Sequence, residues 1–148
     1  MTLIRLKIHE SPEAGGTEIT VTCREVDDRL QDIIRKIEQL LVSFTGRKDG
    51  IVHTLEAESV LYIEAVDNTV FLYTAEDVYE SGRKLYEYEE QLAHTAFLRI
   101  SKNQIVNTAK TMSVRALLNG RFEAKLANGE KTIVNRHYAK AFRNHFLG

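Results

Sequence analysis

The first 48 residues alternate between apolar and polar side chains and then change to a helical spacing. Apolar residues occupy every second position in "LIRLKI" (residues 3–8), and "TEITVTC" (residues 17–23) alternates in the same way. Because "SPEAGG" between them is rich in turn-forming residues, the two runs predict a β-hairpin. Residues 25–44 then place apolar side chains at i, i+3, i+4 and i+7, which predicts an amphipathic helix with acids in its first turn. We therefore expect residues 1–48 to form a small β-β-α extension.

The predicted helix carries an apolar stripe that needs a partner surface. The hairpin or a second copy of the chain would supply one, so we expect the extension to act in dimerisation or in regulation. The polar, glycine-bounded segment "TGRKDG" (residues 45–50) is the best candidate for a domain boundary.

From residue 49 onward the pattern is mainly β. Short apolar runs between polar breaks predict strands at residues 51–55, 60–66, 69–74, 78–81, 97–100, 104–107, 112–118, 121–127 and 130–135. Helical spacing predicts a short helix within residues 83–94 and a final helix over residues 136–148, which Asn135 caps. The pairs Asn119-Gly120 and Asn128-Gly129 predict tight hairpin turns, because both residue types accept positive φ. The fold class is therefore mainly β with short helices (α+β).

The formal net charge of −1 conceals a separation of charge along the chain. Residues 97–148 contain ten Lys or Arg and two acids, a net charge of +8, whereas residues 1–96 contain ten Lys or Arg and nineteen acids, a net charge of −9. A basic half of this kind is typical of proteins that bind polyanions such as nucleic acids. The basic residues follow turns and strands rather than one long helix, which disfavours a DNA-recognition helix.

Composition also limits the compartment and the chemistry. The chain has one cysteine and its first residues lack the apolar core of a signal peptide, so we expect a reducing cytoplasm. The five histidines show no metal-ligand spacing, and no glycine-rich phosphate-binding loop is present. The sequence therefore predicts no catalytic residue, no metal and no cofactor.

Three stretches resemble the LytTR family of bacterial transcription regulators. They are "SVLYIEAVDNTVFLYT" (residues 59–74), "RISKNQIVN" (residues 99–107) and "LNGRFEAKLANGEKTIVNRHY" (residues 118–138). The resemblance covers residues 49–148. It implies a DNA-binding domain of three small antiparallel sheets, which inserts loops rather than a recognition helix into successive grooves of duplex DNA.

The resemblance places DNA contacts at three positions: the turn after "YIEAV", the polar step after "FLRI" and the start of the final helix. The residues at these positions are Asn68, Thr69, Ser101, Lys102, Asn103 and Arg136. Lys140 lies one helical turn after Arg136 and is added as a phosphate contact. Many family members have His or Arg where this chain has Ser101 and Lys102, which favours phosphate contacts there over base contacts.

Two of the basic side chains have more than one interpretation. Arg136 either donates two hydrogen bonds to a guanine or contacts a phosphate. Arg99 either contacts DNA or pairs with a carboxylate such as Glu64.

Many family members also follow a phosphate-accepting receiver domain, for which 48 preceding residues are too few. The chain resembles instead the stand-alone, response-regulator-like subgroup, which implies a small membrane protein as an inhibitor. We expect a homodimer on paired duplex sites. Two other classes stay open, namely single-stranded nucleic-acid binding on a β surface and a protein-interaction module built on the acidic half.

Overall fold

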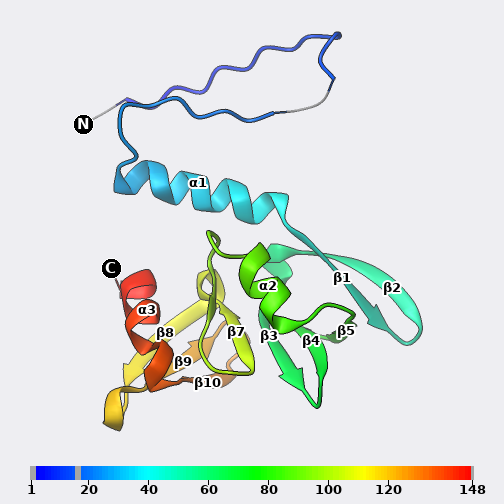
Figure 1. The fold of residues 1–148 in the computed structure, drawn as a ribbon, viewed down its shortest axis with the longest axis vertical. Helices are drawn as coiled ribbons and strands as arrows, with labels where there is room; N and C mark the ends of the chain where they lie inside the picture. Colours follow the sequence, from blue (N-terminus) through cyan, green and yellow to red (C-terminus); the bar gives the residue numbers. More distant parts are fainter. Residues whose placement is uncertain (1–2, 16–17, 148) are drawn as a thin grey trace.

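The computed structural model describes residues 3–15 and 18–147 (Figure 1). Within these residues the chain forms ten strands, three α-helices and three single-turn 3-10 helices. The strands are β1 (Ser43–Lys48), β2 (Ile51–Glu56), β3 (Val60–Val66), β4 (Thr69–Thr74), β5 (Val78–Ser81), β6 (Phe97–Arg99), β7 (Gln104–Asn107), β8 (Thr111–Ala116), β9 (Phe122–Leu126) and β10 (Lys131–Val134). The α-helices are α1 (Asp28–Leu41), α2 (Leu85–Gln91) and α3 (Arg136–Leu147). From residue 51 onward every predicted strand and helix is confirmed.

The strands form two antiparallel sheets. The first has the order β2-β1-β5-β4-β3-β7-β6, and the second has the order β10-β9-β8. The family resemblance implies three small sheets, and the structure differs because neighbouring strands pair continuously. The β1–β2 hairpin joins β5 through the pair Arg47–Glu80, which makes it part of the seven-stranded sheet.

β1 is a strand that the sequence pattern does not predict. The pattern suggests a boundary at residues 45–50, but residues 43–48 pair with β2 over their whole length. Asp49 and Gly50 form the turn between the two strands, with φ of 52° and 76°. The polar break is therefore the turn of a hairpin whose first strand begins at Ser43.

The aromatic ring of Phe44 anchors β1 to the rest of the unit. Phe44 is buried, and its ring centroid lies 5.5 Å from those of Tyr88 on α2 and Phe97 on β6. Burial of aromatic rings in this way is among the larger stabilising contributions to a core. Tertiary packing therefore decides that these six residues are a strand.

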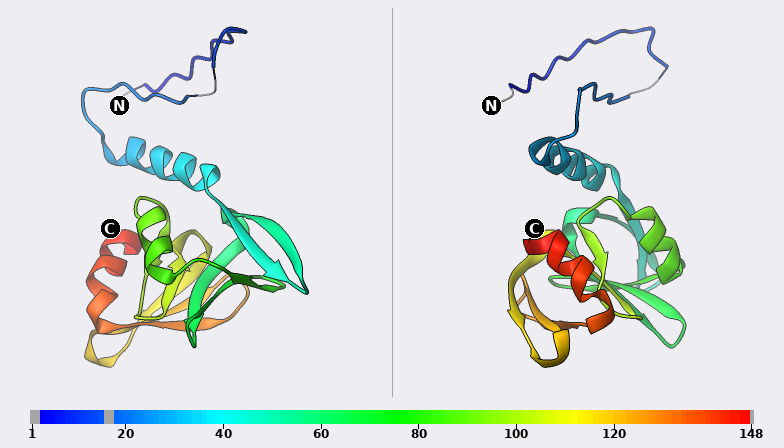
Figure 2. Two further views of the ribbon diagram at one scale, coloured as in Figure 1. Left: turned by 45° about the vertical axis from the view of Figure 1, so that its right-hand side comes forward. Right: turned by 60° about the vertical axis from the view of Figure 1, so that its left-hand side comes forward.

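The β-hairpin predicted near the N-terminus is not formed. Residues 3–15 and 18–27 contain no strand, and residues 1–2 and 16–17 of the prediction lie outside the described part. The two runs extend beyond α1, on the side away from both sheets (Figure 1 and Figure 2). An isolated two-stranded hairpin is marginally stable in water, so an alternating pattern alone does not close a ladder.

The helix predicted over residues 25–44 is confirmed as α1, in a shorter form. Asp27 caps its start, because the Asp27 side chain accepts a hydrogen bond from the Leu30 backbone N–H at 2.8 Å. The apolar stripe is half-buried in the middle of the helix, whereas Leu40 and Leu41 near its end are exposed.

β7 lies between two hydrophobic cores. Ile105 belongs to a core with Ile63 and Leu72, enclosed by the seven-stranded sheet and α2. Val106 belongs to a second core with Phe142, enclosed by the three-stranded sheet and α3. Successive residues of a strand face opposite sides, so one strand contributes to both cores. The polar step that precedes β7 is therefore held from two directions.

A substitution in β1 tests how closely it packs on β5. A Cβ added to Gly46 would lie 2.6 Å from the Cβ of Tyr79 on the neighbouring strand. Gly46→Ala is therefore expected to lower the free energy of unfolding by about 1–3 kcal/mol, measured by urea denaturation. Gly82→Ala is the control, because a Cβ there would meet nothing within 4 Å. Equal stability of the two variants would contradict the close β1–β5 contact.

Candidate nucleic-acid interface

The polar step forms a short loop between β6 and β7. Ser101 is half-buried, and its hydroxyl oxygen accepts a hydrogen bond from the Asn103 backbone N–H at 3.3 Å. The side chains of Lys102 and Asn103 are exposed. The loop therefore uses Ser101 to stabilise its own turn and presents the two following side chains to solvent.

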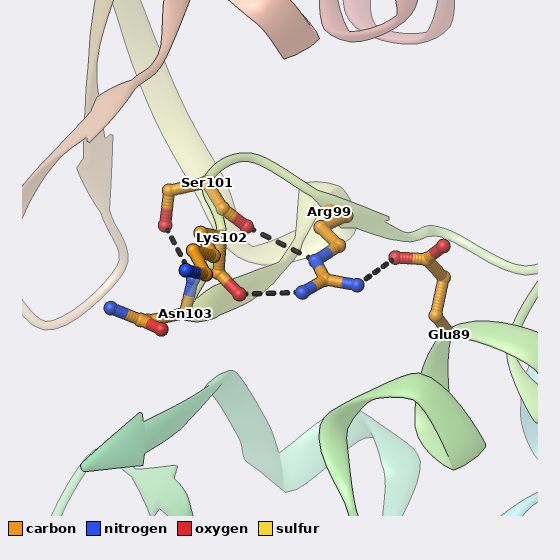
Figure 3. Close-up of polar contacts among 5 residues, drawn as sticks. All are labelled: Glu89, Arg99, Ser101, Lys102 and Asn103. Atoms are coloured by element: carbon orange, nitrogen blue, oxygen red, sulfur yellow. Dashed lines mark hydrogen bonds and ion pairs between the residues drawn. The ribbon is translucent and has the colours of Figure 1, made fainter. Parts of the chain in front are cut away.

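Arg99 holds the backbone of this loop (Figure 3). Its Nε donates to the Ser101 carbonyl at 3.1 Å and its Nη2 donates to the Lys102 carbonyl. Its Nη1 pairs with Glu89 on α2 at 2.8 Å, and the Arg99 side chain is 22% exposed. A planar guanidinium suits this set of fixed acceptors better than an ammonium group. The structure thus pairs Arg99 with Glu89 rather than Glu64, in a structural role.

Two backbone hydrogen bonds join this loop to the other predicted positions. The Asn103 carbonyl accepts from the Ala65 N–H at 2.8 Å, just before the β3–β4 turn. The Ile100 carbonyl accepts from the Asn135 N–H at 2.8 Å, just before α3. The β3–β4 turn and the start of α3 accordingly lie at the same end of the molecule, opposite α1 (Figure 1 and Figure 2). We call this end, comprising residues 67–69, 101–103, 118–121 and 135–140, the loop edge.

The β3–β4 turn supplies the first predicted position. Asp67 and Asn68 have φ of 49° and 66°, as a tight two-residue turn between antiparallel strands requires. The Asn68 side chain is exposed, whereas Thr69 is half-buried at the start of β4. The ammonium group of Lys84 donates to the Asn68 carbonyl at 3.3 Å. Lys84 is therefore a basic neighbour of this turn that the sequence pattern did not single out.

The start of α3 supplies the third predicted position. Asn135 caps the helix as predicted, because its side chain accepts from the His137 N–H at 3.3 Å. Arg136 is exposed, and its stem lies against the β8–β9 turn, where a Cβ on Gly120 would be 3.1 Å from the Arg136 Cγ. Lys140 is exposed one turn later. Gly120 has φ of 73°, a left-handed conformation that favours glycine.

The structure brings all seven predicted site residues to the loop edge, with different accessibility. Asn68, Lys102, Asn103, Arg136 and Lys140 are exposed, whereas Thr69 and Ser101 are half-buried. The exposed side chains are available to a ligand, and the half-buried pair is better suited to shaping the turns. Contact of these residues with DNA stays a prediction.

Arg121 and Leu118 are further members of the loop edge. Both are exposed, and the Nε of Arg121 donates to the Leu118 carbonyl at 3.5 Å across the β8–β9 turn. The sequence signal for the turn is present, because Asn119 and Gly120 both have positive φ as predicted. The contact of this turn with Arg136 depends on tertiary packing, and no local sequence pattern predicts it.

Part of the positive charge of the basic half is neutralised by ion pairs. Glu123 lies 3.2 Å from Arg115 and 3.9 Å from Lys131, on the strands rather than on the loops. Among the described residues, no ion pair involves Lys102, Arg121, Arg136 or Lys140. The loop edge therefore keeps its positive charge available for an anionic ligand.

Side-chain hydrogen bonds connect the two sheets. Tyr62 on β3 donates to Glu130 at 2.8 Å, and burial together with this hydrogen bond raises the pKa of the Tyr62 phenol. Gln104 on β7 donates to Glu64 and accepts from Thr132 on β10 at 2.6 Å. The spacing between loops carried by different sheets depends on these contacts.

The aromatic side chains of the basic half face the cores. Phe97 and Phe142 are buried, and Phe122, Tyr138 and Phe146 are half-buried against the second core. In the part of the chain that the structure describes, the basic half has no exposed aromatic row on which the bases of a single strand would stack.

Residues 3–15 and 18–147 were found to contain no metal site and no helix that could cross a membrane. In these ranges no three His, Cys, Asp or Glu side chains gather closely enough to hold a metal ion. The helices found there are also too short or too polar to cross a bilayer.

Comparison with known proteins agrees with this geometry. A family model described as the LytTr DNA-binding domain matches residues 51–147, which include all segments of the loop edge. The chain belongs to the LytTR family. The LytTR fold is shared by a solved LytTr DNA-binding domain from Bacillus cereus, which aligns with a TM-score of 0.66 and 25% identity over 72% of this chain and 96% of that one.

The chain is also similar to transcriptional regulators of Staphylococcus aureus. Two, both described as uncharacterized HTH-type transcriptional regulators, are 25% identical over 143 residues (strain MSSA476) and 28% identical over 142 residues (strain NCTC 8325 / PS 47). The alignments cover 95% and 93% of this chain and 97% and 96% of those relatives, so they include the N-terminal extension. The transcriptional regulatory protein LytR of strain N315 is 30% identical over 95 residues, which are 64% of this chain and 39% of that protein.

These relationships identify the LytTR chain as a DNA-binding protein of transcription regulation, and its relatives are regulators rather than enzymes. The description HTH-type does not fit this fold. In the described part of the chain, at least one strand separates each α-helix from the next.

Substitution of Arg99 tests whether it positions the loop that follows it. Arg99→Ala removes three hydrogen bonds to fixed acceptors, so we expect affinity for duplex DNA to fall roughly tenfold, or ~1.4 kcal/mol. Arg99→Lys keeps the positive charge but not the planar fork, and it should lose nearly as much. Fluorescence anisotropy with labelled duplex measures the affinity, and thermal unfolding checks the fold. Full recovery by Arg99→Lys would show that charge alone matters.

Proposed function

We propose that this LytTR protein reads a specific duplex sequence by inserting its loops into successive grooves. The observation that supports the proposal is the joining of three loop segments at one edge by the 2.8 Å hydrogen bonds Ala65–Asn103 and Asn135–Ile100. Loops fixed to one another in this way keep a constant spacing, which a regular double helix requires of a protein that contacts it at several points.

The exposed side chains of the loop edge have different roles in the proposal. Arg136 donates two hydrogen bonds to a guanine edge in the major groove. Lys102 and Lys140 contact phosphates, because an ammonium group is a point charge with little geometric selectivity. Asn68 and Asn103 contact base edges or phosphates from the two neighbouring turns.

Duplex DNA is favoured over single strands as the ligand. Single-strand binding without sequence preference uses exposed aromatic side chains on which bases stack. The aromatics of the basic half are buried or half-buried in the described structure. Competition by single strands as strong as that by duplex would favour the alternative.

We propose that the N-terminal extension joins two copies of the chain. We place its end at residue 42 instead of 48, because Ser43 begins a strand of the seven-stranded sheet. The extension lies away from the loop edge and leaves it uncovered (Figure 1). A homodimer on paired sites in the cytoplasm, restrained by a small membrane protein, is the form of regulation that the stand-alone subgroup suggests.

Arg136→Ala tests base readout at the third position. If Arg136 contacts a guanine, its loss should cost ~1–3 kcal/mol on duplex from upstream of the protein's own gene and much less on a scrambled duplex. Fluorescence anisotropy across a salt series measures both affinities. The slope of log affinity against log salt should change by about 0.9 for each phosphate contact that is lost.

Arg29→Ala is the matched control, since it removes one exposed arginine from α1, which lies opposite the loop edge. Equal losses on both duplexes in Arg136→Ala would reduce Arg136 to a phosphate contact. A wild-type protein with no preference between the duplexes would refute sequence-specific readout.

A further inference from the structure

The N-terminal segment exposes an unusual amount of apolar surface. We call residues 3–8 the first run and residues 18–23 the second run. Leu6 and Ile8 of the first run are 87% and 79% exposed, and Ile19 of the second run is 59% exposed. Neither run pairs with a strand in the described structure. Large apolar side chains that are exposed together in one segment mark an interaction site.

A groove separates the second run from α1. It has a volume of about 340 Å³ and is lined by Ile19, Val21, Ile34, Ile37, Glu38 and Leu41. Five of these six side chains are aliphatic, so an apolar strand or helix face fits the groove. Leu41, which lines the groove, is 71% exposed, so the groove opens to solvent.

Glu38 is the one charged residue among the six that line the groove. The Oε2 atom of Glu38 is buried and has no hydrogen-bond partner among the described residues. A buried carboxylate oxygen without a donor is costly, because folding has removed its water. The groove therefore calls for an occupant that combines aliphatic side chains with a cationic donor.

The first run has this combination. Ile4, Leu6 and Ile8 alternate with Arg5 and Lys7, and the run contains no acid. In the structure the first run is exposed along its whole length, so it does not occupy the groove of its own chain. Each copy thus carries one open groove and one free run that matches it in apolarity and charge.

We propose that the first run of a second copy fills this groove and that the exchange is reciprocal, which forms an arm-exchanged homodimer. Arg5 or Lys7 of the incoming run pairs with the carboxylate of Glu38. In a two-fold exchange, the first run of each copy fills the groove of the other copy. No first run and no groove is then left free, so the assembly stops at two copies. The inference rests on the proposed function in one respect, because the dimer would present two loop edges to two paired DNA sites.

Mixing two charge-reversed variants of the full chain tests the exchange. Glu38→Lys alone, and Arg5→Glu with Lys7→Glu, should each weaken the homodimer at least tenfold, because like charges then meet in the groove. An equimolar mixture should form a heterodimer with near wild-type affinity, since each arm meets the opposite charge. Analytical ultracentrifugation gives the dissociation constants, and native mass spectrometry separates heterodimer from homodimers. Glu13→Lys, in the exposed turn between the runs, is the control and should dimerise normally.

Several outcomes would overturn the exchange. A wild-type chain that stays monomeric across the accessible concentrations would do so, as would variants that dimerise like the wild type. Recovery only when all three changes are in one chain would place the contact within a chain. Far-ultraviolet circular dichroism of each variant excludes unfolding as the cause of lost dimer.

Failure of the exchange and failure of the proposed function are distinguishable. Arg136→Ala should dimerise normally while losing its preference for specific duplex. The arm variants should retain their preference for a single site over scrambled duplex. Loss of preference by the wild type would refute only the DNA readout.

Discussion

The position of β7 between two cores is the constraint on which the rest of the structure depends. Ile105 and Val106 are adjacent in the chain but pack into different cores, so a one-residue shift in register would place Gln104 or Asn107 in a core position. The loop that precedes β7 is fixed by the same constraint. Arg99 then adds hydrogen bonds to the loop backbone, and Glu89 orients Arg99 from α2. Two exposed side chains are thereby presented on a rigid support.

The separation of charge follows from this architecture. The acids of the basic half are used within the fold, where Glu130 ties the sheets together and Glu123 pairs with basic residues on the strands. The basic side chains of the loop edge have no such partners in the described structure. Exposed ion pairs contribute little to stability, so leaving these charges unpaired costs the fold little. It makes them available for phosphates and bases.

The two ends of the molecule serve different needs. The loop edge is polar and tied to both cores, as repeated contact with a regular double helix requires. The opposite end carries α1, the two N-terminal runs and much exposed apolar surface. Apolar surface favours association with another protein surface, and a charged edge favours DNA. Distance between the two ends allows two copies to associate without covering the loops.

The sequence by itself determined the strands and helices from residue 51 onward and the tight turn at Asn119-Gly120, because alternation, helical spacing and turn chemistry are local properties. The candidate loops also followed from family resemblance. Only tertiary structure decided that Ser43–Lys48 is a strand, since the burial of Phe44 overrides a polar, glycine-containing segment. It also decided that Arg99 pairs with Glu89 and that Gly120 meets Arg136. The N-terminal runs alternate correctly yet do not pair, because a ladder needs a partner surface that a local pattern does not supply.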